Sequence, residues 1–169
     1  PLRAQQSMGY LPEGAPAWPD MTPRQFLDFV TRIRGLDKAA ARSATGQAVD
    51  MTELHGVLDQ PIDTLSKGFR RRVGLAQTIV HDPDFLIMDE PTDGLDPNQK
   101  HQVRGAIREM ARTKAIIIST HILEEVDAIC TRAMIIDRGR MIVEGTPSEL
   151  AARSAYHGAV VVTARSDKA

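Results

Sequence analysis

The stretch DPDFLIMDEP, residues 82–91, contains the pattern that predicts the fold. Its Asp-Pro-Asp start interrupts the chain before a short aliphatic run, residues 85–88, and two carboxylates, Asp89 and Glu90, follow that run. A second aliphatic run, residues 115–118, comes after a helical pattern that begins at Pro97. Aliphatic strands without polar alternation, separated by helices, are typical of a parallel sheet with helices on both faces. The sequence therefore predicts an α/β fold with buried parallel strands.

The residues before this core have helical patterns. Thr22-Pro23-Arg24-Gln25 combines a cap residue, a proline at the first helical position and a glutamine that can complete a capping box. Apolar residues then recur at helical spacing up to Gly35. We expect a second helix after Asp37 and a third over residues 51–58.

The residues after the core predict further elements. A helix is expected over residues 123–129, a hairpin over residues 133–143, a proline-started helix from Thr146 and a strand over residues 159–163.

Composition excludes some classes of protein. The 21 Lys and Arg residues nearly balance 22 Asp and Glu residues, so the net charge of -1 gives no general attraction to nucleic acid. A single cysteine cannot form an internal disulfide. The aliphatic runs have the length of strands and are too short to span a bilayer.

The carboxylates after the first aliphatic run are candidates for chemistry. Ligands of open parallel sheets bind at the carboxyl ends of the strands, where Asp89, Glu90 and also His121 are expected. Asp89 could hold Mg²⁺ through water, and Glu90 could accept the proton of an attacking water. A surface Asp-Glu pair in the turn before Pro91 explains the position equally well.

A group of cations stands at a predicted helix start. Lys67 and the arginines at 70–72 follow Ser66, and cations there oppose the helix dipole unless an anion lies nearby. Ser66 offers a hydroxyl, and Gly68 offers a backbone without a Cβ where a phosphate could approach. A solvated basic helix start is the simpler alternative. A nucleic-acid patch is less favoured, because no aromatic residues are interleaved with the arginines.

Together these segments resemble the nucleotide-binding domains of ATP-binding cassette (ABC) proteins over roughly residues 8–150. Five motifs occur in the family's order: Gly9-Tyr10-Leu11-Pro12-Glu13 resembles the segment that ends in the Q-loop, Leu65-Ser66-Lys67-Gly68-Phe69 the signature, Phe85-Leu86-Ile87-Met88-Asp89-Glu90-Pro91 the Walker B strand, Asp93-Gly94-Leu95-Asp96 the D-loop, and Ser119-Thr120-His121 the switch histidine. One such motif is weak evidence, whereas five in order are specific.

The resemblance implies a mechanism in which two such domains enclose two ATP molecules with Mg²⁺, head to tail. It implies that Asp89 serves the Mg²⁺ shell, that Glu90 polarises the hydrolytic water and that His121 contacts the γ-phosphate.

For the remaining motifs the resemblance implies contacts with magnesium or with the partner subunit. Ser66, Lys67 and Gly68 would reach the ATP of the partner subunit, Glu13 could face the magnesium, and the D-loop residues Asp93, Gly94, Leu95 and Asp96 would help to link the two sites.

The sequence departs from the family pattern at several of these positions. Glu13 stands at the usual glutamine of the Q-loop, and Lys67 and Phe69 replace a glycine and a glutamine of the signature. Arg71 stands where a glutamine is common, and Asp93 replaces the first serine of the D-loop. This combination resembles exporter-type cassettes of bacterial two-component transporters, including those of multidrug and gliding-motility systems.

The sequence contains no Gly-Lys pair, so it has no G-x-x-x-x-G-K-[ST] phosphate-binding loop. Because the family places this loop before the Q-loop, we expect a fragment that is cut at both ends and inactive alone. The expected organisation is a partial ABC ATPase domain over residues 1–150, with a helical subdomain at roughly 20–80 and a Walker B core at roughly 81–145. Residues 151–169 are expected to begin a C-terminal extension.

The expected function is that of an ATP-hydrolysing subunit of an ABC transporter. Its partners would be a second ABC ATPase domain, as a homodimer, and an integral-membrane permease at the cytoplasmic face of the membrane, with no nucleic acid. The alternatives are a non-hydrolysing regulatory partner and a soluble ABC ATPase without a transport role.

Overall fold

The computed structural model describes residues 7–153. These residues belong to two compact units, one up to His121 and one from Ile122 onward, called here the N-terminal and C-terminal units. The strand expected over residues 159–163 lies outside the described residues.

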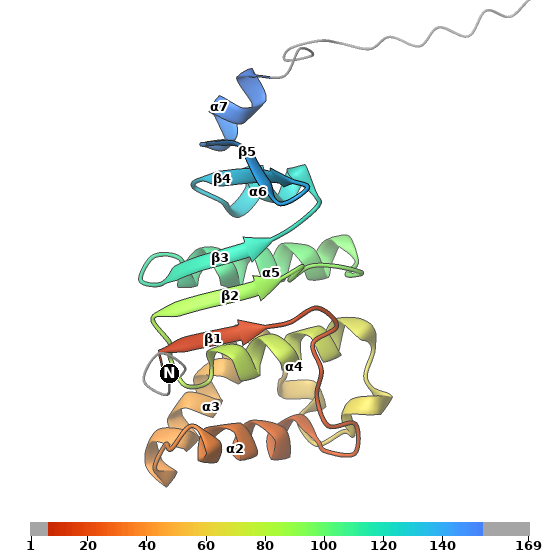
Figure 1. Cartoon of the computed structure of the whole chain (residues 1–169). Helices are drawn as coiled ribbons and strands as arrows, with labels where there is room; N and C mark the ends of the chain where they lie inside the picture. The colour runs from red at the N-terminus through yellow and green to blue at the C-terminus, as the bar shows by residue number, and fades with distance from the viewer. Residues whose placement is uncertain (1–6, 154–169) are drawn as a thin grey trace, which may run out of the picture. The chain divides into compact units, whose positions relative to one another are not determined.

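The N-terminal unit contains a parallel sheet of three strands in the order β1-β2-β3 (Figure 1). The strands are β1 (Met8–Leu11), β2 (Phe85–Asp89) and β3 (Ala115–Ser119). Leu11 lies opposite Met88, and Met88 lies opposite Ile118. The α/β class and both aliphatic strands predicted from the sequence are therefore confirmed.

Helix α4 (Lys67–Ile79) packs against β1 at unusually close range. Two glycines permit this approach, because a Cβ on Gly9 would collide with the carbonyl of Thr78, and one on Gly74 would lie 3.1 Å from Cδ1 of Leu11 in β1 and 2.5 Å from the Cβ of Ala15 in the following loop. The same helix contributes buried aliphatic side chains to the core of the unit.

Only one face of the sheet is well covered by the described residues. Leu86 and Met88 are almost completely buried, at 1% and 0% exposure, whereas Phe85 and Ile117 are 57% and 67% exposed. Alternate residues of a strand point to opposite faces, so the exposed side chains belong to the second face. The expectation that these strands are buried on both faces is therefore wrong for residues 7–153, where helix packing covers the face that carries Leu86 and Met88.

Two helices precede the signature segment. Helix α2 (Pro23–Ile33) begins at the predicted capping box, in which Thr22 and Gln25 cap each other's backbone N–H groups. Helix α3 (Lys38–Thr52) is capped by Asp37 and contacts α2 and α4.

The third helix expected over residues 51–58 is wrong. Helix α3 continues to Thr52, and Glu53 ends it in a left-handed conformation with φ of 53°. Short 3₁₀ turns follow, η1 (His55–Val57) and η2 (Ile62–Thr64). The left-handed residue turns the chain, which leaves too few residues for a further α-helix before the next turn.

Helix α5 (Pro97–Met110) connects β2 to β3 and begins at the predicted proline. Asp96 caps it by accepting the backbone N–H groups of Asn98 and Gln99, each at 3.0 Å.

The C-terminal unit consists of α6 (Leu123–Ile129), the antiparallel strands β4 (Ala133–Asp137) and β5 (Arg140–Gly145), and α7 (Pro147–Ala152). Arg138 and Gly139 both have positive φ, which fits the tight turn predicted for this hairpin. Thr146 and Glu149 form the capping box of α7. Within residues 7–153, no helix combines the length and the apolar character that crossing a membrane requires.

Candidate active site

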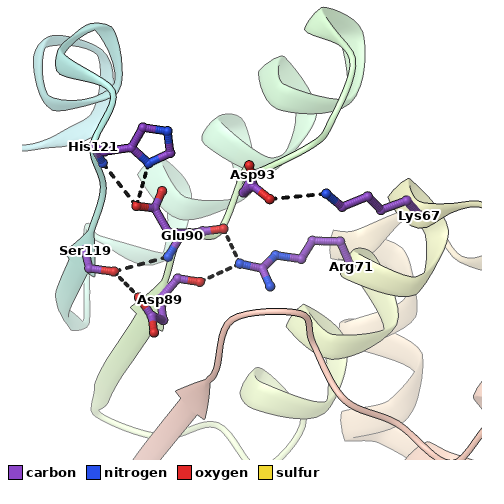
Figure 2. Close-up of polar contacts among 7 residues, drawn as sticks. All are labelled: Lys67, Arg71, Asp89, Glu90, Asp93, Ser119 and His121. Atoms are coloured by element: carbon purple, nitrogen blue, oxygen red, sulfur yellow. Dashed lines mark hydrogen bonds and ion pairs between the residues drawn. The ribbon is translucent and has the colours of Figure 1, made fainter.

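The carboxyl ends of β2 and β3 bring four predicted motif residues together, namely Asp89, Glu90, Ser119 and His121 (Figure 2). Asp89 lies opposite Ser119 in the sheet register. The hydroxyl of Ser119 donates to Oδ1 of Asp89 and accepts the backbone N–H of Glu90 at 3.2 Å. Ser119 therefore fixes Asp89 and Glu90 relative to β3, a role that the sequence did not reveal.

The carboxylate of Glu90 is held by His121. Oε1 of Glu90 accepts the backbone N–H of His121 at 3.1 Å and lies 2.8 Å from its Nδ1. Both interactions end on Oε1, so Oε2 is the oxygen that can accept a proton from a water molecule. The side chain of Glu90 is 19% exposed, whereas that of His121 is 70% exposed. This geometry suits a general base that is oriented by a histidine.

The backbone of Glu90 has an unusual conformation. Its φ is 46°, in the left-handed region that costs free energy for a residue with a Cβ. The carbonyl of Ser119 accepts its N–H at 3.2 Å, and its own carbonyl accepts the N–H of Asp93 at 3.1 Å. Backbone strain of this kind is common at functional sites and needs surrounding contacts to persist.

The donor set fits a magnesium ion that is bound mainly by phosphate oxygens and water. The described residues contain no group of three or more His, Cys, Asp or Glu that could enclose a metal. Mg²⁺ in phosphate-transfer sites typically takes one or two carboxylates and otherwise water and phosphate oxygens. Asp89 has one carboxylate oxygen bonded to Ser119, and its second oxygen could face such an ion.

The predicted basic helix start has partners within the chain. Lys67 Nζ lies 3.2 Å from Oδ2 of Asp93 (Figure 2). Arg72 pairs with Glu53 at 3.4 Å and also donates to the side chain of Gln102. The fold thus brings the anion Asp93 to Lys67 and the anion Glu53 to Arg72, so neither cation depends on an anion from outside the chain.

Arg71 is the most buried of these cations, at 6% exposure. Its guanidinium donates to backbone carbonyls, including those of Asp89 and Glu90 (Figure 2). Burial lowers the pKa of Arg71, and the charges of Asp93, Asp89, Glu13 and Glu90 act in the opposite direction. The sequence marked Arg71 as one of the cations at the helix start and as a departure from the family pattern, but it gave no sign of these partners.

The signature residues begin α4. Ser66 caps the helix by accepting the N–H of Phe69 at 3.3 Å, and it is exposed. Gly68 is buried, and the side chain of Gln99 occupies the space that a Cβ on Gly68 would need. The structure thus assigns Ser66 a capping role, while its contact with a partner's ATP stays a prediction.

The D-loop residues have separate roles in the N-terminal unit. The hydrogen bond and charge of Lys67 lower the pKa of Asp93 below its ordinary value. Gly94 has φ of 65°, and the end of the Lys67 side chain occupies the space that a Cβ would need. Leu95 is buried, and Asp96 caps α5. The link across a dimer that the resemblance implies for Asp96 stays a prediction.

Glu13 lies on the loop after β1, apart from the contacts around Glu90. Together with Lys67, Arg71 and Asp93 it lines an open depression of about 540 Å³. The structure therefore gathers the predicted residues into two groups, one around Glu90 and one around the Lys67–Asp93 pair. Arg71 contacts the first group through hydrogen bonds and lines the second.

Comparisons with known proteins agree with this geometry. The model of the ABC transporter family matches residues 2–93. A Nod factor export ATP-binding protein I from Burkholderia orbicola is 38% identical over 148 residues, which are 87% of this chain and 49% of that protein. An uncharacterized ABC transporter ATP-binding protein, YxlF of Bacillus subtilis, is 34% identical over 85% of this chain and 48% of its own length.

Solved structures lead to the same family. The structure of CbiO1 from Clostridium perfringens, part of the ABC transporter complex CbiONQ, superposes with a TM-score of 0.80 at 28% identity. The superposition covers 90% of this chain and 62% of the CbiO1 chain. The chain spans about half the length of the curated relatives that it matches. The match to the family model, the sequence relatives and the solved structure all show that this chain belongs to the ABC transporter family.

Proposed function

We propose that this chain forms the water-activating half of the ATP site in an ATP-binding subunit of an ABC transporter. The observation that carries the proposal is the carboxylate of Glu90, which His121 orients beside Asp89 at the end of β2. When bound, ATP supplies the γ-phosphorus that is attacked, and Mg²⁺ neutralises negative charge on the phosphates.

The residues of this chain then act on the water and on the metal shell. Oε2 of Glu90 accepts a proton from a water molecule as the water oxygen bonds to the γ-phosphorus and the bond to ADP breaks. His121 keeps Oε1 of Glu90 in place, which aims Oε2 at the water. Asp89, which Ser119 restrains, is the residue that would hold a magnesium ion here.

The phosphate-binding loop of the proposed site must come from residues outside the 169, since these contain no Gly-Lys pair. The same absence favours one second candidate, a non-hydrolysing partner that offers only its signature residues to another subunit. The arrangement of Glu90 and His121 supports the hydrolysing role, because a partner without chemistry would not need an oriented base.

The proposal includes two partners and a location. In a dimer of two copies, Ser66, Lys67 and Gly68 of one copy would contact the ATP bound by the other. An integral-membrane permease would bind the subunit at the cytoplasmic face of the membrane. The names of the ABC transporter relatives support the permease, and Nod factor export in several of them supports the exporter type. The exposure of Ser66 and Lys67 supports a contact with a second subunit.

The test compares Glu90→Gln with the parent in the complete subunit that carries its phosphate-binding loop. The amide keeps the shape of the side chain but cannot accept the proton, so ATP turnover should fall about 10²- to 10⁴-fold while ATP binding is kept. Glu109→Gln on the exposed face of α5 is the matched control and should turn over ATP like the parent. Turnover of Glu90→Gln within about twofold of the parent, well short of that range, would reject the hydrolysing role.

A further inference from the structure

We propose that Arg71 is a positioning residue that holds the main chain of Glu90 and ties it to the loop after β1. The inference rests on the proposed function, in which Glu90 activates the water. Arg71 itself lies on α4, the helix that the signature residues begin, so it links three of the predicted motifs.

The contacts of Arg71 define this role. Its Nε donates to the carbonyl of Pro91 at 3.1 Å, and its Nη1 donates to the carbonyl of Pro12 at 3.2 Å. Its Nη2 donates to the carbonyls of Asp89 and Glu90. One buried guanidinium thus bonds Asp89, the last residue of β2, the two residues that follow it, and Pro12 in the loop after β1. The planar guanidinium of an arginine can donate to several acceptors at once, whereas the lysine ammonium group donates from a single nitrogen atom.

The choice of acceptors matters for the chemistry. Asp89 and Glu90 both offer a negatively charged carboxylate close to Arg71, yet the guanidinium bonds their carbonyls instead. The carboxylate of Asp89 therefore stays available to a metal shell, and that of Glu90 stays with His121. Arg71 supports the site without neutralising either reactive group by direct pairing.

The backbone of Glu90 needs such support. It is left-handed, with φ of 46°, and its N–H is held by Ser119 from β3. Arg71 bonds its carbonyl from α4, so the peptide groups on both sides of Glu90 are fixed. A misplacement of about 1 Å at a catalytic group can cost about 10²-fold in rate. Removing the guanidinium should therefore act on turnover through the position of Glu90.

Arg72 provides a matched control for burial and helix stability. It is the next residue of α4 and is similarly buried, at 8% exposure. Its partners, however, are Glu53 and Gln102, and its guanidinium lies 5.4 Å from the centre of the Phe69 ring. Loss of Arg72 should lower stability and leave the position of Glu90 unchanged.

The experiment measures kcat and KM for ATP in the complete subunit with its phosphate-binding loop. Arg71→Met, which removes all donors, should lower kcat about 10- to 100-fold with KM changed less than about threefold. Arg72→Met should lower the unfolding temperature, while the kcat per folded molecule stays at the parent value. A kcat of Arg71→Met within about twofold of the parent would overturn the proposal.

A second arm separates positioning from general weakening. In a Glu90→Gln background Arg71 has no base to position, so adding Arg71→Met should not lower the residual rate further. Multiplicative losses in the double variant would overturn the role through Glu90.

If Arg71→Met does not fold, Arg71→Lys takes its place. The lysine keeps the charge but cannot bond both the Pro12 carbonyl and the carbonyls of residues 89–91, so kcat should fall at least about fivefold. Parent-like turnover of a folded Arg71→Lys would then contradict the proposal.

The two proposals fail in different ways. If Glu90→Gln turns over ATP like the parent, the proposed function fails, whatever Arg71 does. If Glu90→Gln is inactive and Arg71→Met is fully active, only the inference about Arg71 fails.

Discussion

Nδ1 of His121 lies 2.8 Å from Oε1 of Glu90, and the backbone N–H of the same histidine donates to that oxygen at 3.1 Å. The two residues are 31 positions apart in sequence and follow the carboxyl ends of neighbouring strands of the sheet. One bond comes from the main chain and one from the side chain, so a substitution at His121 can remove the second alone.

His121→Ala should lower kcat for ATP by about 10²-fold in the complete subunit, because Glu90 loses the side-chain bond that orients its carboxylate. The backbone bond remains, so the protein should fold normally and bind ATP. Steady-state turnover and equilibrium ATP binding check the two parts. His101→Ala, an exposed histidine on α5, is the control, and equal activity of the two alanine variants would contradict the orienting role.

Ser66 distinguishes a helix cap from a contact across a dimer. As a cap alone, Ser66→Ala should cost about 0.5–2 kcal/mol of stability with little effect on turnover. If Ser66 also reaches the partner's ATP, Ser66→Arg should keep ATP binding in each subunit but block dimer closure and hydrolysis. Sedimentation with ATP and turnover assays measure these effects.

Mixed dimers sharpen the same test. A Ser66→Arg subunit paired with a Glu90→Gln subunit forms one doubly altered site and one intact site. The mixture should turn over ATP when neither mutant homodimer does, provided that one intact site can work alone. Normal dimerisation and turnover of the Ser66→Arg homodimer would leave Ser66 with its capping role only.

Gly94→Ala should destabilise the protein by at least about 1–2 kcal/mol, because a Cβ is unfavourable in the left-handed conformation. The new methyl would also displace the flexible Lys67 side chain, which pairs with Asp93. Urea unfolding of Gly94→Ala, with and without Lys67→Ala, measures both effects. The second substitution should restore only part of the lost stability, and full restoration would show that the backbone conformation contributes nothing.

His81 should make stability depend on pH. Its Nε2 lies 3.1 Å from the carbonyl of Met8, and its buried Nδ1 has no hydrogen-bond partner among the described residues. Burial is the main cause that lowers its pKa below the ordinary 6.5; Arg34 and Lys114 also lower it, and Asp82 and the Met8 carbonyl oppose them.

The folded protein therefore favours neutral His81. Its contribution to stability is complete above about pH 6.5 and is lost as the pH falls from there to the folded-state pKa. His81→Gln can still donate to Met8 but cannot gain a proton, so its unfolding free energy should fall less on acidification. Urea unfolding of both proteins from about pH 8 to pH 5 tests this, and parallel curves would contradict it.

The sequence by itself determined the family and those elements that have local start or periodicity signals. The caps at Thr22 and Thr146, the proline at the start of α5 and the aliphatic runs of β2 and β3 are local signals, and the structure confirms each of them. Local signals suffice because capping bonds and side-chain periodicity involve residues that are close in sequence. The five motifs in order gave the family for the same reason, since each is a short contiguous segment.

Tertiary structure alone decided which groups meet and which faces are covered. The sequence showed crowded cations at the start of α4, but only the fold showed that Arg71 bonds the carbonyls of Pro12 and Glu90. It likewise placed Ser119 between Asp89 and Glu90, and it left Phe85 and Ile117 exposed on the second face of the sheet. These outcomes depend on contacts between segments far apart in the chain, where an arginine bonds whichever carbonyls the packed helix and strands bring within reach. No local pattern encodes that distance, because it is set by how closely α4 packs against β1 through Gly9 and Gly74.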